Sequence, residues 1–390
     1  YGDLIILVVR TNQEGGSHGM SLLCVDLKSQ GITKNKINKL GWRSSDTAEM
    51  GFDNVKVPKE NLIGEEGKGF YYLMNGLQLE RLCFLPSLVA CMEYGISESL
   101  YYMSQRKAFG KTIDKFEVLR HRLSQLSSEV EALKNFSYFC CDMFDKDIYD
   151  VKLCSMGKLL VTELHEKVST QCLQFFGGNG YTEDYPMARM YRDSRIGTIG
   201  GGTSEIMRDI IAKIIIDDVQ YEKEKSSLSS KNEKIDKSDS LTLSSAEKYA
   251  NKNFSVAIEA LKIAENTIEL TVNHIESNRG EKRKAGTQSE RHNIAQLSSE
   301  IECYKQYVFS IMLRSENEKN LKKEISMAEL ISLQVMDKVV SNCFEMFGDF
   351  EDIENHKLYG NLKKSKSIII SNSKASLLDE ISESLIDKKE

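Results

Sequence analysis

The hydrophobic positions follow a two-residue pattern near the start of the chain and a three- to four-residue pattern afterwards. Residues 3–9 and 21–27 are short apolar runs rich in branched side chains, and the segment between them, 12–18, is turn-prone. Residues 37–57 alternate in places and end at a proline, which is typical of one or two further strands. We therefore expect a partial antiparallel β-domain, incomplete as a fold, over residues 1–62.

From Gly67 onward the apolar positions recur every three or four residues, as in an amphipathic helix. The first such helix extends to about residue 105, and its apolar face carries Phe70, Leu73, Leu77, Phe84, Leu88 and Met92. Three more helical patterns follow, over 114–144, 151–176 and 203–218. Only three prolines occur in the whole chain, so long helices are permitted. The pattern predicts an up-and-down four-helix bundle over residues 63–219.

The chain then repeats itself after a polar segment. Residues 220–245 are rich in Ser and Lys and almost free of apolar side chains, which is typical of a linker. QLSSEVE at 125–131 matches QLSSEIE at 296–302, a shift of 171 residues (296 − 125). Other positions match at the same shift, which we call the repeat offset. Two amphipathic helices with common residue types are the alternative explanation, but a gap-free register across two helices favours a repeat. We expect residues 246–390 to be a degenerate second copy of the bundle.

Composition narrows the classes of function. The 390 residues are 41% hydrophobic and 28% charged, as in soluble globular proteins of two or three domains. Acidic and basic residues are interleaved at a net charge of −6, so we expect no nucleic-acid partner. The nine cysteines form no CxxC pair, which favours a reduced intracellular compartment, and we predict no metal site. No apolar run reaches the roughly 18 residues that span a bilayer.

Glu80 is the sharpest local signal for chemistry. It lies three residues after Leu77 and four before Phe84, so the spacing places a carboxylate on the apolar helix face. Burial there raises the pKa of a carboxylate and suits it to proton abstraction. The spacing leaves open the alternative that Glu80 forms a structural ion pair with an arginine of a neighbouring helix. Arg81 faces elsewhere on the same helix and cannot be that partner.

Three glycine-containing segments end or begin helices. Arg106–Gly110 closes the first helix, where Gly110 can adopt a left-handed cap. Gly177–Gly180 ends another, and its three glycines either form a plain turn or let the backbone approach an anion. Gly200–Gly202 precede Thr203, an expected N-cap, and can expose N–H groups to a phosphate or an oxyanion.

These segments are not kept in the second copy. At the repeat offset, Arg106 corresponds to Ser277 and Gly201 to Asn372. The helical scaffold persists while the special residues are lost. We infer that these residues bind a ligand in the first copy.

In combination these features resemble the acyl-CoA dehydrogenase family, over about residues 1–216. The motifs in family order are Trp42–Glu49 (WRSSDTAE), Val55–Pro58 with Asn61–Gly64, Gly67–Phe70, Arg106–Gly110 followed by Ile113 and Phe116, Gln174–Gly180 (QFFGGNG), Arg192–Asp193 and Gly202–Ile206 (GTSEI). The chain opens at Tyr1 inside an apparent strand, and the resemblance lacks the family's N-terminal helical domain. We therefore expect a preceding segment, with any targeting peptide, to be missing.

The resemblance implies a noncovalent FAD held between two subunits. Several residues would contact the flavin bound mainly by the partner subunit: Arg106, Phe109, Gly110, Ile113, Phe116, Gln174, Gly177 and Gly178. Thr203 and Glu205 would contact FAD in the subunit's own site, and Arg81 and Gly202 would lie at the substrate. Glu117 stands where the family commonly has glutamine, which puts one FAD contact in doubt.

The resemblance also implies a reaction. In the family a glutamate removes the α-proton of a fatty acyl-CoA thioester while a hydride leaves the β-carbon for the flavin, giving a trans-2-enoyl-CoA, and the electrons pass to electron-transferring flavoprotein. Most members carry that glutamate in a Tyr-Glu-Gly-Thr motif, where this chain has Gly201. Isovaleryl-CoA and long-chain members place it on the earlier helix before an arginine, as in Leu79-Glu80-Arg81. We predict Glu80 as the base and the Gly201 N–H as a donor to the thioester carbonyl.

The second helical copy resembles the extra domain of very-long-chain members, in which it can replace a second pair of subunits. We therefore expect a homodimer, with peripheral membrane contact through the C-terminal domain, in a bacterial cytoplasm or a mitochondrial matrix. The fold class expected is mainly α with a partial antiparallel β-domain, a family-like four-helix bundle and a degenerate second bundle. A catalytically silent assembly or membrane-docking module, and an acyl-CoA oxidase, are the alternative functions.

Overall fold

The computed structural model describes residues 2–13, 16–146, 148, 150–219, 243, 252–277, 286–318, 320–347 and 357–386. The fold is mainly α-helical with small antiparallel sheets, which confirms the predicted fold class. The chain divides into two compact units, Tyr1–Glu80 and Arg81–Glu390, and the division falls inside the long helix α1 (Gly69–Gln105). Apart from Leu243, the predicted linker residues 220–245 lie outside the described residues, and the predicted domain boundaries stay predictions.

The first unit contains the strands β1 to β5. β1 (Leu4–Arg10), β2 (Met20–Asp26) and the two-residue β5 (Leu62–Ile63) form an antiparallel sheet in the order β1-β2-β5. β3 (Ile32–Lys36) pairs with β4 (Ala48–Phe52) in a second antiparallel pair. β3 begins earlier than the expected start at residue 37. Its side chains are exposed after the first residue, so the strand carries no alternation of apolar and polar positions that a sequence could show.

The first set of helices in the second unit follows the predicted ranges closely. α1 continues into this unit, followed by α2 (Glu117–Asp145), α3 (Val151–Phe176), α4 (Pro186–Ser194) and α5 (Ser204–Ile216). The helix α4 was not expected, because its nine residues span little more than two turns and offer few repeats of a helical period. The apolar faces of α1, α2, α3 and α5 meet in one hydrophobic core.

The second set of helices reproduces the first at the offset found in the sequence. It consists of α7 (Ser255–Ser277), α8 (Gln288–Ser315), α9 (Lys322–Phe347), α10 (Lys357–Ser371) and α11 (Lys374–Ile386). The repeat offset takes the bounds of α3, 151–176, to 322–347, which are the bounds of α9. The same shift takes α2 to within one residue of α8.

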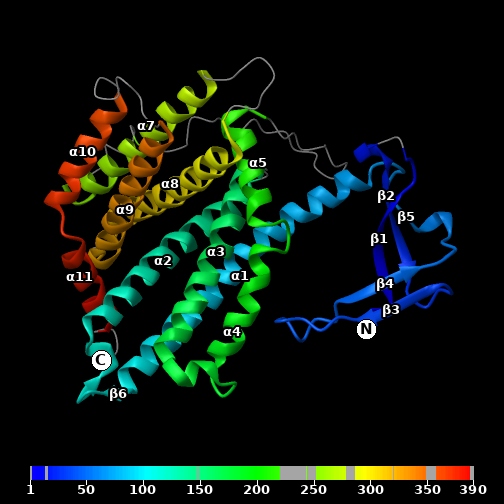
Figure 1. The fold of residues 1–390 in the computed structure, drawn as a ribbon, viewed down its shortest axis with the longest axis horizontal. Helices are drawn as coiled ribbons and strands as arrows, with labels where there is room; N and C mark the ends of the chain where they lie inside the picture. The colour runs from blue at the N-terminus through cyan, green and yellow to red at the C-terminus, as the bar shows by residue number, and fades with distance from the viewer. Residues whose placement is uncertain are drawn as a thin grey trace. The chain divides into compact units, whose positions relative to one another are not determined.

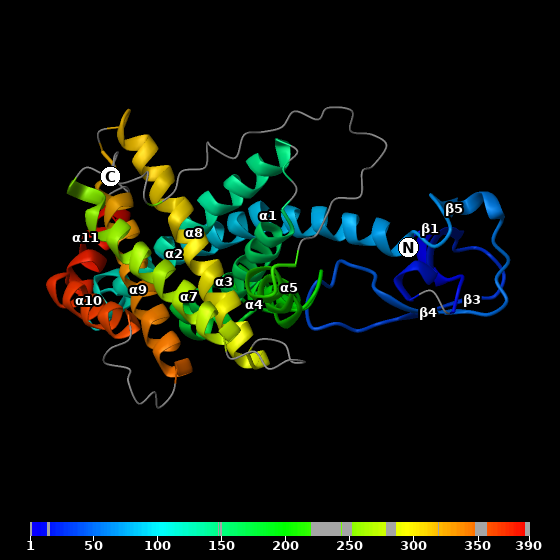
Figure 2. The same cartoon turned by 90° about the horizontal axis from the view of Figure 1, so that it is seen from above.

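The two sets pack against each other through equivalent helices. α2 lies against α8, α5 lies against α8, and α11 lies against α2 (Figures 1 and 2). His121 Nε2 lies 2.8 Å from Asp379 Oδ1 on α11, and His292 Nε2 lies 2.9 Å from Asp209 Oδ1 on α5. The repeat offset takes His121 to His292, and it takes α5 to within one residue of α11. The arrangement is that of two similar bundles meeting about an approximate two-fold axis.

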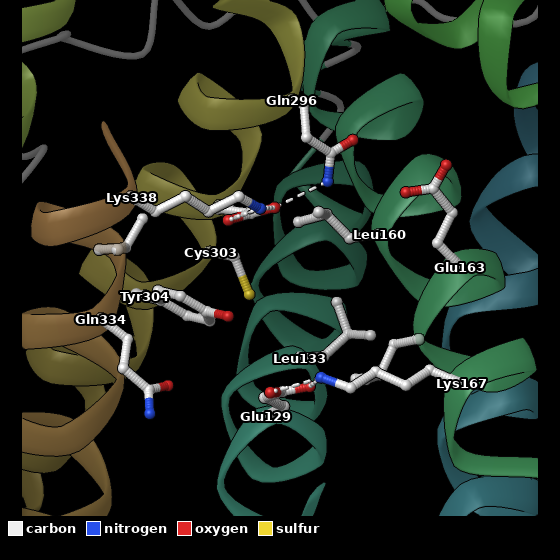
Figure 3. Close-up of a pocket in the computed structure, with 13 residues that line it drawn as sticks. Glu129, Leu133, Leu160, Glu163, Lys167, Gln296, Cys303, Tyr304, Gln334 and Lys338 are labelled. Atoms are coloured by element: carbon white, nitrogen blue, oxygen red, sulfur yellow. Dashed lines mark hydrogen bonds and ion pairs between the residues drawn. The ribbon is translucent and has the colours of Figure 1, made fainter. Parts of the chain in front are cut away.

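A polar cavity of about 340 Å³ lies between α2, α3, α8 and α9, where the two sets meet (Figure 3). Lys167 Nζ lies 2.6 Å from Glu129 Oε2, and Lys338 Nζ lies 2.6 Å from Glu300 Oε1. The repeat offset takes the first pair to the second. We call these four residues the joint between the two bundles. Each pair lies within one bundle, between α2 and α3 or between α8 and α9, and both pairs line the cavity where the bundles meet.

Candidate functional site

Glu80 is exposed, so the expectation that the fold itself desolvates this carboxylate is wrong. The buried face of α1 runs along Leu82, Leu85, Val89 and Met92. At 3.6 residues per turn, Glu80 lies about 160° around the helix from Leu82. Apolar residues occur on several sides of α1, since Leu79 and Tyr94 are also exposed, and the sequence therefore did not show which side faces the core.

Two buried cationic side chains donate hydrogen bonds to the triglycine turn before α5, Gly200–Gly202. Arg81, on α1, is 4% exposed, and its Nε donates to the carbonyl oxygen of Gly201 at 3.0 Å. Lys158, on α3, is fully buried, and its Nζ donates to the carbonyl oxygen of Gly202 at 2.5 Å. Two consecutive carbonyls of one turn are thus each fixed by a cation from a different helix.

The turn requires glycine at two positions. Gly201 has φ of 67° and Gly202 has φ of 106°, both in the region that favours glycine. A Cβ on Gly202 would lie 2.8 Å from Cε of Met207, which is fully buried in the core. The backbone of the turn is therefore packed closely against the core side.

Thr203 begins α5 as predicted. Its hydroxyl oxygen accepts a hydrogen bond from the N–H of Ile206 at 3.4 Å. Glu205 is exposed in the first turn, and hydrogen bonds from its own N–H and from the Thr203 side chain lower the pKa of its carboxyl group. Thr203 and Glu205 line an open cavity of about 510 Å³ between α3, the short helix at Arg195–Thr198 and α5.

A second group of predicted residues gathers at the far end of α3. Arg106, Ile113, Gln174, Gly177 and Gly178 line one groove of about 320 Å³. Gly177 ends α3 with φ of 57°, and a Cβ on either glycine would meet no atom within 4 Å. A guanidinium, a carboxamide and open backbone therefore face the same groove, a donor set that suits an anionic ligand.

Gly110 is left-handed, with φ of 83°, but it does not cap the helix. α1 ends at Gln105, and the chain then forms a hairpin of β6 (Lys107–Ala108) and β7 (Lys111–Thr112). Phe109 and Gly110 form its two-residue turn, and both have positive φ. The prediction of a cap was wrong, because a two-residue hairpin demands the same left-handed glycine.

Phe109 is the most exposed large apolar side chain of the described residues, at 96%. Its ring packs edge-on against Phe116 with the centroids 6.4 Å apart, and Lys111 Nζ lies 4.3 Å from the centroid of the Phe116 ring. The hairpin thus holds an aromatic side chain outward on a short, hydrogen-bonded arm.

The predicted residues therefore form two separate groups, and one contributor was missed. The groove at the end of α3 and the open cavity at Thr203 share no lining residue, as expected if one contacts the partner subunit's flavin and the other the subunit's own. Lys158 was missed, although it stands in the otherwise apolar run Met156–Val161, where a lysine is unusual. Among the described residues, no group of three His, Cys, Asp or Glu side chains can hold a metal ion. None of the described helices is long and apolar enough to cross a membrane.

Comparison with known proteins identifies relatives of both copies. A protein-family model described as "Acyl-CoA dehydrogenase, C-terminal domain" matches residues 67–216 and 246–350. The mitochondrial long-chain specific acyl-CoA dehydrogenase of Rattus norvegicus is 40% identical over 219 residues, which are 55% of this chain and 51% of that protein. The mitochondrial isovaleryl-CoA dehydrogenase of Oryza sativa is 36% identical over 210 residues, 54% of this chain and 51% of the relative. The chain spans about half the length of these curated relatives.

Solved structures share the fold. An acyl-CoA dehydrogenase of Bacillus anthracis, solved in complex with FAD, covers 100% of this chain with 68% of its own length, at a TM-score of 0.81 and 18% identity. An acyl-CoA dehydrogenase of Geobacillus kaustophilus covers 54% of this chain with 57% of its own length, at a TM-score of 0.53 and 38% identity. The first likeness shows that one known fold accommodates both helical copies.

Proposed function

Because this chain belongs to the acyl-CoA dehydrogenase family, we propose that it contributes the helical half of an enzyme that oxidises a fatty acyl-CoA to the trans-2-enoyl-CoA. Electrons would leave through electron-transferring flavoprotein, and the reaction would serve fatty-acid β-oxidation. Relatives at 40% and 36% identity are named as mitochondrial enzymes, which supports a matrix location for a eukaryotic source.

One observation carries the proposal: Arg81, the residue after Glu80, bonds to the carbonyl oxygen of Gly201. The hydrogen bond ties α1, at Arg81, to the turn that the family uses at the thioester. We assign Arg81 to holding this turn, with the Gly201 N–H as the donor to the thioester carbonyl and Gly202 beside it. A backbone donor fixed in this way stabilises the negative charge that develops on the carbonyl oxygen during proton removal.

Glu80 is proposed as the base that removes the α-proton. Its carboxylate is exposed, so the proposal requires that the bound thioester exclude water from it. Loss of water around the carboxylate on binding would strengthen it as a base. Binding of the substrate and activation of the base would then be one event.

The two groups of donor residues fit FAD. The groove with Arg106, Gln174, Gly177 and Gly178 offers a cation and open backbone to an anionic dinucleotide, and the exposed Phe109 can reach a ligand on another subunit. Thr203 and the N-terminus of α5 offer N–H groups to phosphate in a second place. When bound, FAD supplies the two-electron acceptor. Two separate half-sites on one chain are what a flavin shared between subunits requires.

We further propose a homodimer. The joint between the bundles, with Lys167–Glu129 repeated as Lys338–Glu300, gives the first bundle an internal neighbour that resembles itself. The surface that would otherwise bind a further pair of subunits is thereby covered. The exposed hairpin at Phe109 leaves one other face for a partner subunit.

The base is tested in the full-length protein that contains this chain. Glu80→Gln keeps the size of the side chain and removes its ability to accept a proton, and we expect acyl-CoA-dependent dye reduction to fall at least about a thousandfold, within the range that general bases contribute. The flavin content should be unchanged. Glu93→Gln is the matched control, because Glu93 is an exposed glutamate on the same helix, paired with Lys134.

Three results would count against the proposal. Near-normal bleaching of the flavin by acyl-CoA in Glu80→Gln would show that the base is another group. A wild-type protein that binds FAD but is not bleached by any acyl-CoA from four to twenty carbons would support a catalytically silent module. Rapid reoxidation of the reduced flavin by oxygen would indicate an oxidase.

A further inference from the structure

Lys158 is buried at a position where a lysine is costly. It is fully buried on α3, and moving an ammonium group out of water destabilises a fold unless partners compensate. Its Nζ donates to the carbonyl oxygen of Gly202. A neutral apolar side chain would pack in this run of α3 at lower cost, so the geometry of the triglycine turn explains the lysine better than packing does.

The hydrogen bond acts on the peptide group that joins Gly202 to Thr203. In a trans peptide the C=O and the N–H point in opposite directions, so the Thr203 N–H points away from Lys158. A cation bonded to the carbonyl also polarises the peptide and makes its N–H a stronger donor. Thr203 lines the open cavity at the start of α5, where the helix dipole favours negative charge.

The second copy provides an internal comparison. α9 has the bounds of α3 shifted by the repeat offset, so Lys158 corresponds to Glu329, and Gly202 corresponds to Ser373. The joint lysine Lys167 keeps its equivalent, Lys338. The buried lysine is thus replaced where the glycine turn is absent, while a lysine that pairs with a glutamate of the neighbouring helix in the same bundle is retained.

We propose that Lys158 is a positioning residue that fixes the Gly202–Thr203 peptide so that the Thr203 N–H faces a phosphate oxygen of FAD. This inference rests on the proposed function, because it takes FAD as the ligand at Thr203. Lys158 is fully buried and bonded to the turn, so it would act on a ligand through the peptide.

The charge on Lys158 changes within an accessible pH range. Burial lowers the pKa of Lys158 to about 8, the Arg81 charge lowers it further, and Glu163 and Glu205 oppose the shift. The ammonium is charged below about pH 8 and is lost as the pH rises through that value. On the same helix, the pKa of Cys154 is raised to about 11 and that of His165 is lowered to about 4, both mainly by burial, so neither titrates near pH 8.

The experiment measures the dissociation constant of FAD in the full-length protein between pH 7 and pH 9, by quenching of flavin fluorescence. Wild type should bind FAD about tenfold more weakly at pH 9 than at pH 7. Lys158→Met should bind about tenfold more weakly than wild type at pH 7 and show no step near pH 8. Lys152→Met, a partly exposed lysine on the same helix, should behave as wild type.

The free energy of unfolding is measured in the same samples, because a rise in pH should change it in the opposite direction to FAD affinity. The pKa of an unfolded lysine is near 10.4, so between about pH 8 and pH 10 the unfolded chain keeps a proton that folded Lys158 has lost. The deprotonation of Lys158 therefore stabilises the fold as the pH rises, while FAD binding weakens.

A dissociation constant of FAD that does not change from pH 7 to pH 9 in the wild-type protein would overturn the inference, even if Lys158→Met failed to fold. Absence of FAD binding at any pH would overturn the proposed function as well.

Discussion

Removing Arg291 should destabilise the contact between the bundles at the end of α5. Arg291, on α8, donates from Nη1 to Asp217 Oδ1 at 3.1 Å and from Nη2 to Asp217 Oδ2 at 2.6 Å. The two side chains are only 6% and 16% exposed. Asp217 follows the last residue of α5, so this two-pronged pair joins the end of a first-copy helix to the second copy.

The magnitude follows from the burial of the partner that remains. In Arg291→Met, Asp217 keeps its charge in a nearly buried position without the guanidinium, and breaking such a pair costs roughly 3–5 kcal/mol. Since Asp217 retains some contact with water, we expect the low end, a loss of about 3 kcal/mol in the free energy of unfolding. Arg314→Met is the control on the same helix, because Arg314 pairs with Glu318 at 2.9 Å with both side chains over a third exposed. An exposed pair of this kind contributes only about 0.5 kcal/mol.

The assay is urea denaturation of the chain followed by circular dichroism, with the free energies compared at matched slopes. The double variant Arg291→Met, Asp217→Leu should recover a large part of the loss, because it also removes the carboxylate that has lost its guanidinium. If Arg291→Met costs no more than Arg314→Met, the pair does not hold the bundles together, and the reasoning from burial is refuted.

Two further predictions concern the turn and α3. Gly202→Ala should lower the free energy of unfolding by about 2 kcal/mol or more in urea titrations. The φ of 106° is strained for alanine, and the new Cβ would lie 2.8 Å from Cε of Met207. Gly178→Ala is the control and should stay within about 1 kcal/mol of wild type, because Gly178 lies in open space and has no positive φ. Burial lowers the pKa of His165 to about 4, with Asp193 opposing, so as the pH falls from about 6.5 to 4 the unfolded chain takes up a proton that the folded chain does not. Stability should fall by up to about 3 kcal/mol across that range, at about 1.36 kcal/mol for each unit of difference. His165→Asn should remove this loss, and an unchanged pH dependence in the variant would assign it to other groups.

The helices and the repeat could be predicted because each depends only on the order of residue types along the chain. The recurrence of apolar residues every three or four positions marked α2 and α3 within a few residues of their ends. The repeat offset needed only a comparison of the chain with itself, and it returned as the matched bounds of α3 and α9. Thr203 was predicted as an N-cap because capping depends on a residue type next to a helix start.

The parts that the sequence did not show depend on orientation around a helix or on contacts across the fold. The face of α1 that points to the core was ambiguous, since apolar residues occur on several sides, and Glu80 was placed on the wrong side. The hairpin after α1 was missed because its left-handed glycine also fits a helix cap. The roles of Arg81 and Lys158 at one turn became visible only when α1, α3 and the turn were brought together.

The two copies make different contributions to α5. The residue before its start, Thr203, is the candidate phosphate contact, and the residue after its end, Asp217, is bonded to Arg291 of the second copy. α5 packs against both α3 and α8. The first bundle therefore supplies the turn that orients this helix, and the second bundle supplies a helix that packs against it. The second copy has kept the residues of the joint and lost the glycine turn. The second bundle can therefore hold α5 in place without a glycine turn of its own.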